Sequence, residues 1–213
     1  MALKFGDSKG SAQKTSIEQY AMVNGDNQLR LVGNLLPRYD NWIEGENNKN
    51  IPFECLSFDR ATETFNNKEK DWVRTYYPDL NCGWAYAVQC IDPSDGKVKV
   101  FNLKKKLMEQ ILTLAEDLGD PTDPEKGWPI CFKRVKTGPL AYNIEYQLQA
   151  IKCQKAVGPL TEEEKELVKD LRSMDEVLPR PTPDAQKELL DRINSAKSET
   201  TDNDTLDEEF DIE

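Results

Sequence analysis

The sequence predicts a β-rich α+β fold in which five strands form a small Greek-key barrel with inserted helices, followed by C-terminal helices and a disordered acidic tail. Three observations predict it: short segments alternate apolar and polar residues, one longer segment has helical spacing, and acidic residues collect at the C-terminal end. The 213 residues divide into a flexible arm, a core, a helical, proline-containing extension and a tail, over residues 1–20, 21–156, 157–198 and 199–213.

Strands are predicted where side chains alternate with a period of two. Two of them form a hairpin around the turn at residues 92–96, because Pro93 fixes φ and Gly96 takes the positive-φ position. The strands are expected over residues 28–36, 51–58, 84–91, 97–101, 127–135 and 143–153.

Helices are predicted in the middle of the chain and near its C-terminal end. Apolar residues recur at helical spacing over residues 103–118, and Gly119 ends that helix. Thr161 and Glu164 form a capping box that opens a second helix. A short helix is expected over residues 184–195, and the acidic chain after it is too poor in apolar residues to fold.

The composition argues against most enzymes. The chain has no histidine, which excludes Ser-His-Asp and Cys-His catalysis, and it has no glycine-rich phosphate loop. The cysteines are scattered without a Cys-x-x-Cys pair, so we expect reduced structural thiols, no zinc and no cofactor. No apolar run could span a bilayer or serve as a signal peptide, so a cytosolic location is expected, the host cytoplasm if the protein is viral. The cysteines are Cys55, Cys82, Cys90, Cys131 and Cys153.

The net charge of −11 is distributed unevenly. Residues 157–213 contain 18 Asp and Glu against 7 Lys and Arg, whereas residues 1–156 contain 21 of each. Because the body is neutral, it can still have one basic face, and the acidic total does not argue against nucleic-acid binding.

Two basic clusters are candidates for phosphate contacts. On the predicted strand 97–101, Lys97, Lys99 and Phe101 share one face and would offer two cations and a stacking ring. The alternative is that these clusters are ordinary solvated surface. The further basic candidates are Lys104, Lys105, Lys106, Lys133, Arg134 and Lys136.

Aromatic residues are concentrated between residues 72 and 146. Trp84 and Tyr86 share one face of their strand, and Tyr76 and Tyr77 lie beside Arg74 in a polar segment. We take all five as candidates for DNA contacts, with the hydrophobic core as the alternative for the aromatic ones.

The C-terminal tail combines carboxylates with apolar residues, which is typical of a peptide that docks on partner proteins. A purely solubilising tail is the alternative, although such a tail needs no apolar residues. The predicted docking residues are Leu206, Asp207, Glu208, Glu209, Phe210, Asp211 and Ile212.

Several of these segments together resemble the single-stranded DNA-binding (helix-destabilising) proteins of T-even-type phages. The resemblance covers about residues 80–150 and extends to the character of the acidic tail. The strings that carry it, by their order and spacing, are Gly83-Trp84-Ala85-Tyr86-Ala87-Val88, Asp92-Pro93, Gly96-Lys97-Val98, Lys104-Lys105-Lys106-Leu107, Phe132-Lys133-Arg134-Val135-Lys136 and residues 138–142.

The resemblance implies an OB-fold-like core that binds single-stranded DNA between a basic rim and stacked aromatics. It places Trp84, Phe101 and Tyr142 at aromatic positions of the family and Lys104 to Lys106 at its basic run. It also implies roles in DNA replication, recombination and repair, with a tail that recruits replication and recombination proteins.

The chain departs from the family pattern at two places. The family carries a zinc site of one His and three Cys, which this histidine-free chain lacks, so a metal-independent subdomain is expected there. The arm that promotes head-to-tail self-association on DNA is approached only by Lys14, Thr15 and Ser16. Two other functions stay open: a non-catalytic interaction scaffold without nucleic-acid binding, and a carboxylate-dependent enzyme acting on nucleic acid.

Overall fold

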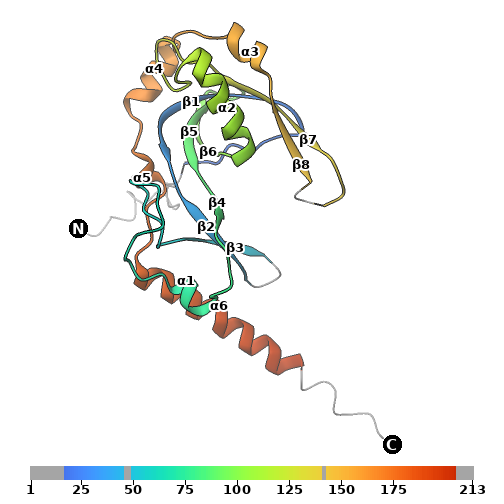
Figure 1. Cartoon of the computed structure of the whole chain (residues 1–213), viewed down its shortest axis with the longest axis vertical. Helices are drawn as coiled ribbons and strands as arrows, with labels where there is room; N and C mark the ends of the chain where they lie inside the picture. The colour runs from blue at the N-terminus through green and yellow to red at the C-terminus, as the bar shows by residue number, and fades with distance from the viewer. Residues whose placement is uncertain (1–16, 46–48, 141–142, 205–213) are drawn as a thin grey trace, which may run out of the picture.

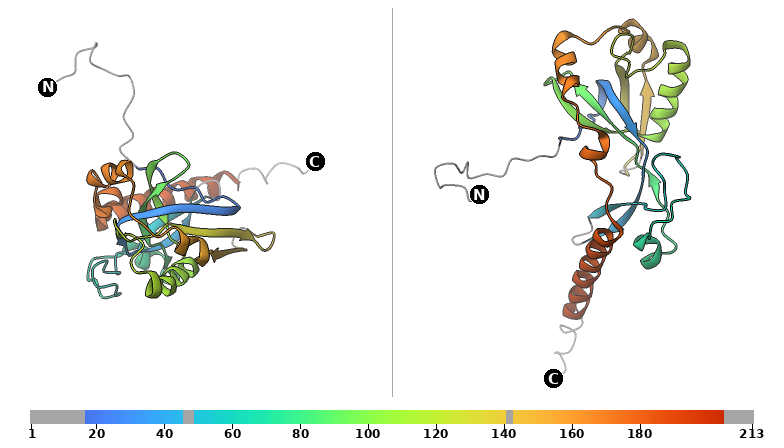
Figure 2. Two further views of the ribbon diagram at one scale, coloured as in Figure 1. Left: turned by 90° about the horizontal axis from the view of Figure 1, so that it is seen from above. Right: turned by 90° about the vertical axis from the view of Figure 1, so that its left-hand side faces the viewer.

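The computed structural model describes residues 17–45, 49–140 and 143–204, with the backbone alone for residues 196–204. It confirms a β-rich α+β fold and arranges it as two lobes, the upper and lower parts of Figure 1. The upper lobe is built on a five-stranded antiparallel sheet and the lower lobe on a three-stranded one. The right-hand view of Figure 2 shows from another side that β1 runs from the upper lobe toward the lower one.

The upper sheet has the order β6-β5-β1-β7-β8. Its central strand β1 pairs with β7 through residues 25–29 and with β5 through residues 30–36, so the sheet curves around this strand. Pairing between the two edge strands is not found among the described residues, and a closed barrel is therefore not shown. The strands are β1 (Gly25–Leu36), β5 (Ala87–Asp92), β6 (Lys97–Asn102), β7 (Ile130–Lys136) and β8 (Ile144–Leu148).

Helix α2 (Lys105–Leu118) packs on this sheet and closes the main core. Its apolar stripe buries Leu107 and Ile111 against strand residues, and Gly119 ends the helix as predicted, with a positive φ. Trp128, which precedes β7, is fully buried in the same core.

The lower lobe contains a three-stranded sheet covered on one face by two helices (Figure 1). Ile43 and Phe53 from the sheet pack with Val73 of α1 and with Leu190 and Ile193 of α6 in a second core. The C-terminal chain therefore completes the lobe. The elements are β2 (Tyr39–Glu44), β3 (Asn50–Glu54), β4 (Gly83–Trp84), α1 (Trp72–Tyr76) and α6 (Pro183–Asp204).

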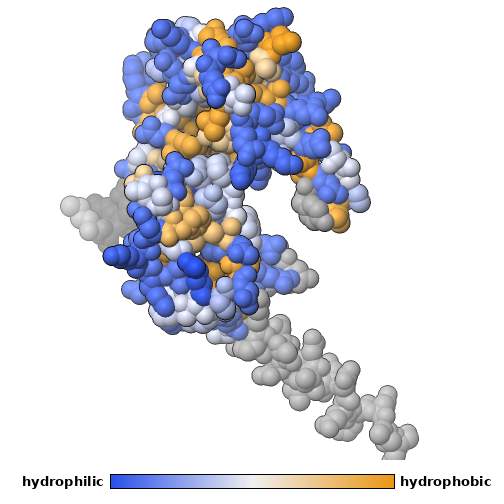
Figure 3. Space-filling view, in the orientation of Figure 1, coloured by the Kyte–Doolittle hydropathy of each residue, from blue (hydrophilic) through white to orange (hydrophobic). Residues whose placement is uncertain are grey.

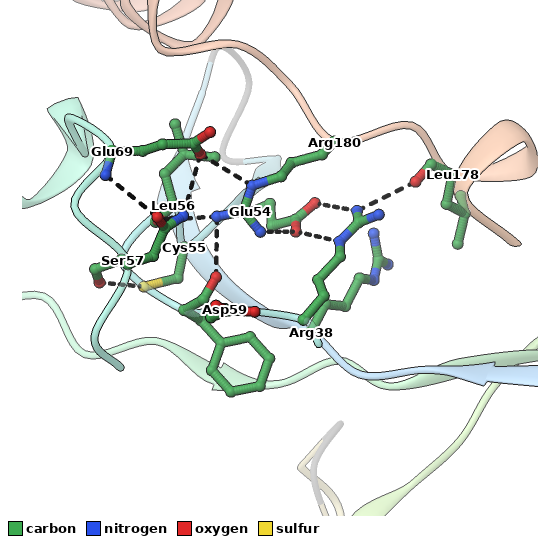
Figure 4. A network of polar contacts seen from close by, with 12 residues as sticks. Arg38, Glu54, Cys55, Leu56, Ser57, Asp59, Glu69, Leu178 and Arg180 are labelled. Carbon is green, nitrogen blue, oxygen red and sulfur yellow. Dashed lines mark hydrogen bonds and ion pairs between the residues drawn. The ribbon is translucent and has the colours of Figure 1, made fainter. Parts of the chain in front are cut away.

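Two arginines fasten this C-terminal chain to the sheet of the lower lobe. Arg180 donates to the backbone oxygens of Leu56 and Phe58 and pairs with Glu54, as Figure 4 shows. Arg60 meets the same Glu54 carboxylate from the other side, with Nη2 at 2.6 Å. A group of three or more His, Cys, Asp or Glu placed to hold a metal is not found within the described residues.

Three short helices connect the lobes: α3 (Ala150–Lys155), α4 (Glu162–Lys169) and α5 (Met174–Val177). The predicted capping box of Thr161 and Glu164 is confirmed at the start of α4. Helix α6 continues to Asp204, past the end predicted at residue 195. No helix in the described part of the chain has the length and apolar character needed to cross a membrane.

The structure adds one strand that the sequence pattern does not predict and divides another. Strand β2 lies in a segment whose side chains do not alternate between apolar and polar. The predicted strand over residues 143–153 divides into β8 and α3. The chain turns at Gln149, the N-cap residue of α3, and the buried side chain of Cys153 belongs to that helix.

Candidate nucleic-acid interface

The front of the molecule is hollowed between the two lobes. Figure 3 shows a gap bordered by the start of α2 and the β7–β8 hairpin above and by the β2–β3 ribbon below. Its upper border is basic and its lower border carries exposed aromatic side chains, as the following residues show.

The start of α2 is a concentrated positive site. Lys104 is the N-cap residue and makes no side-chain capping bond, and the first turn contains no acidic residue. Lys104, Lys105 and Lys106 are exposed, and none of them forms an ion pair with a described residue. A helix N-terminus with unpaired N–H groups and three lysines favours an anion such as a phosphate.

One glutamine fixes this helix relative to the β7–β8 hairpin. Gln110 Nε2 donates to the backbone oxygen of Tyr146 at 2.9 Å, and Gln110 Oε1 accepts from the backbone N–H of Leu148 at 2.7 Å. Both ends of one amide are thus bonded to β8. The lysines of α2 and the basic residues of the hairpin are therefore held in one arrangement.

The basic run on β7 divides between the two faces of the strand. Arg134 and Lys136 share the face of Phe132, which points into the core beside α2, whereas Lys133 points the opposite way. Lys133 lies opposite Asp26 in the strand register, and Arg134 hydrogen-bonds the side chain of Asn24. Only Arg134 and Lys136 extend the basic border of the gap.

Trp84 lies directly below the start of α2. Its indole Nε1 donates to the backbone oxygen of Leu103 at 2.7 Å, one residue before the lysines. The ring of Tyr86 is stacked on it at 3.7 Å between centroids and 11° between planes, and the ring of Tyr39 meets it edge-on at 6.3 Å. Trp84 is half-buried and can present its outer surface to the gap.

Tyr86 supports Trp84 from the interior and is itself only 5% exposed. Burial raises the pKa of Tyr86, and the hydrogen bond from its hydroxyl to Glu63 raises it further. Tyr86 therefore positions Trp84 and lies in the hydrophobic core, the alternative given for it in place of a DNA contact.

Trp42 is a candidate that the sequence analysis missed. Its side chain is 53% exposed on β2, on the face opposite Ile43 and the helices of the lower lobe. That face borders the gap beneath the β7–β8 hairpin (Figure 1). The signal in the sequence is an isolated Trp before an Asn-rich segment. Because apolar and polar residues do not alternate around Trp42, no strand is predicted there.

The predicted face on β6 is not available. Phe101 is fully buried between Tyr20 and Phe132. Residues 17–20 pair with β6, because the backbone N–H of Tyr20 donates to Val100 and the backbone N–H of Val100 donates to Glu18. Lys99 is occupied by Asp92 and Asp95 at 2.7 and 2.9 Å. Of this face only Lys97 stays exposed, at the turn of the hairpin.

Arg74, Tyr76 and Tyr77 belong to the lower lobe and do not face the gap. Tyr76 donates its hydroxyl to Asp191 and Tyr77 donates to Asn194, both at 2.6 Å, which ties α1 to α6. Arg74 Nη1 donates to Ser57 Oγ at 3.4 Å.

Some predicted residues lie outside the described part of the chain, and their roles stay predictions. They are Tyr142, the arm residues Lys14 to Ser16 and the docking residues Leu206 to Ile212.

No family model matches this sequence. The chain is similar to a protein of Escherichia phage T5 named a probable ssDNA-binding protein. The two are 27% identical over 194 residues, which cover 84% of this chain and 73% of that protein.

Proposed function

We propose that this protein binds single-stranded DNA without sequence preference in the gap between its two lobes. Lys104 to Lys106, Arg134 and Lys136 contact phosphates, and Trp84 and Trp42 stack on bases. The protein acts by binding and performs no catalysis.

The observation that carries this proposal is the pairing of an unneutralised basic border with the exposed Trp42 and the half-buried Trp84 across one gap. Phosphate contacts supply affinity that depends on salt, and stacking is tolerant of sequence because every base has a π-face. The name of the similar protein of phage T5 agrees with this chemistry.

A fluorescence titration with oligo-dT at two salt concentrations tests the proposal. Of the four tryptophans, Trp42 and Trp84 border the gap, whereas Trp128 is fully buried. We expect quenching on binding and a steep loss of affinity with salt. Absence of binding would favour the interaction scaffold, and turnover of DNA that requires a divalent metal would favour the enzyme.

We further propose that the protein serves phage DNA replication, recombination and repair in the manner of the T-even-type proteins. The tail, residues 199–213, recruits replication and recombination proteins through its carboxylates and through Leu206, Phe210 and Ile212. Lys14, Thr15 and Ser16 support self-association along DNA.

The tail also competes with DNA for the basic border of the gap. Helix α6 leads the chain away from the gap as far as Asp204 (Figure 1). We therefore propose that the competition acts between neighbouring molecules. Deleting residues 205–213 should tighten DNA binding at low salt, increasingly so at higher protein concentration, and unchanged affinity would contradict this.

A further inference from the structure

Arg30 is a buried cation on the side of the upper sheet that faces away from α2. Its neighbours Leu29 and Leu31 point into the main core, so Arg30 points to the opposite face of β1. A cavity of about 230 Å³ lies there. Its lining includes Gln28, Arg30, Ile91, Pro93, Pro159 and Glu164.

The guanidinium of Arg30 is held in place by backbone carbonyls. Nη2 donates to the oxygens of Asp123 and Gly158 at 2.9 and 3.1 Å. A Cβ on Gly127 would lie 2.4 Å and 2.6 Å from the backbone oxygens of Asp123 and Pro121, so glycine is required beside the guanidinium. Arg30 is 8% exposed, and its buried Nε makes no hydrogen bond to any described residue.

The two nearest carboxylates do not bond to this cation. Asp123 Oδ1 accepts from the backbone N–H groups of Glu125 and Lys126, and Glu164 Oε2 accepts from that of Thr161. Burial lowers the pKa of Arg30, although Glu164 and Asp123 favour its charged form. A buried charge with no bonded counterion is costly and is stabilised by an anion that reaches it.

We propose that this cavity binds a carboxylate at the end of a short aliphatic stem, presented by an acidic peptide of a partner protein. The Arg30 guanidinium holds the carboxylate, and the walls formed by Ile91, Pro93 and Pro159 contact the aliphatic stem. The site is separate from the gap that we propose for DNA, because it lies on the other face of the upper sheet.

The surroundings favour a carboxylate over a phosphate. One arginine supplies one positive charge, and Glu164 at the border disfavours a doubly charged phosphate monoester. The apolar walls match methylene groups, which inorganic phosphate lacks.

Amide chemical shifts measured during titration of the full chain test the site. The probes are an acetyl-Gly-Glu-Gly-amide peptide, sodium propionate and inorganic phosphate, with sodium chloride as the ionic-strength control. We expect saturable shifts at residues 91–93 and 156–160 with the peptide and propionate, in the range of about 1–10 mM. Arg30→Met should abolish them.

Because Arg30→Met can destabilise the fold, a second pair of variants acts from the border of the cavity. Gln28 is exposed on the same strand face as Arg30. Gln28→Glu should weaken peptide binding roughly threefold and Gln28→Lys should strengthen it by a similar factor, as expected for one charge in partly solvated surroundings. Oligo-dT affinity should stay the same in both variants.

Three outcomes would overturn the inference: shifts with phosphate but not with carboxylates, shifts with propionate but not with the peptide, or no difference between the two Gln28 variants. If the wild-type protein did not bind oligo-dT, that result would overturn the DNA proposal and leave the carboxylate site unaffected.

Discussion

The start of α2 and the β5–β6 hairpin are neighbours in the sequence, and both carry lysines, but the structure uses them differently. On the hairpin, Lys99 is enclosed by Asp92 and Asp95 and the ring of Phe101 is buried. At the start of α2, three lysines are exposed on a helix end that favours anions. We therefore expect a lysine to contribute to DNA binding only if it is not already paired with nearby carboxylates.

The comparison is tested most strongly by replacing Lys104, Lys105 and Lys106 together with alanine. Each lysine that neutralises a phosphate contributes about 0.7 to the salt slope, so the slope should become shallower by about 2 and low-salt affinity should fall by about 100-fold. Oligo-dT titrations over a series of salt concentrations measure both. Lys97→Ala on the exposed hairpin turn is the control, and an equal loss there would contradict the assignment.

Replacing single tryptophans distinguishes the residues that border the gap from the rest of the lower lobe. Trp42→Ala should weaken oligo-dT binding by roughly 5- to 100-fold, the effect of losing one stacked base, with little change in thermal stability. Trp84→Ala should weaken it similarly but also lower stability, because Trp84 packs on Tyr86.

Trp72→Ala is the matched control for these two variants. Trp72 lies on α1 under the ammonium groups of Lys70 and Lys187. The Trp72→Ala variant should be less stable than the wild type and keep its affinity for oligo-dT. A loss of affinity comparable to that of the other two variants would show that the interface extends to α1.

The buried position of Phe101 makes the opposite prediction for the hairpin. Phe101→Leu should reduce the free energy of unfolding by about 1 kcal/mol, because it removes packing volume from the main core. Denaturant unfolding measures this. DNA affinity of the folded variant should be unchanged, and a loss of affinity without a loss of stability would return Phe101 to the interface.

The smallest expected effect is a pH dependence of the stability that the β5–β6 hairpin turn contributes to the fold. Burial is the largest single influence on Asp92 and raises its pKa, but hydrogen bonds from Lys99 and Ser94 bring the net pKa below its ordinary value. A hydrogen bond from Lys99 likewise lowers the pKa of Asp95. These lowered values stabilise the fold above the ordinary pKa of about 3.9, and the contribution is lost as pH falls through the folded-state values.

Lys99→Met removes this pairing. Its stability deficit relative to the wild type should therefore shrink as pH is lowered below about 4, while its salt slope for DNA stays that of the wild type. Unfolding curves between pH 3 and 7 measure the first, and a deficit that stays constant over this range would contradict the pairing.

The local elements of this protein can be predicted from short stretches of its sequence. The turn at Pro93 and Gly96, the helix ending at Gly119 and the capping box at Thr161 all follow from residues within one turn of each other. Lys104, Lys105 and Lys106 are exposed for the same local reason, since the apolar residues of that helix recur at helical spacing and form one stripe. Their contact with DNA stays a prediction.

Which faces stay accessible depends on how distant segments pack together. Residues 17–20 cover β6, α6 completes the lower lobe across more than a hundred residues of sequence, and Trp42 is exposed because both covering helices pack on the other face of its sheet. Periodicity identifies an apolar face and its polar opposite, but the accessibility of a side chain depends on segments that are distant in the sequence, because packing is set by contacts in space.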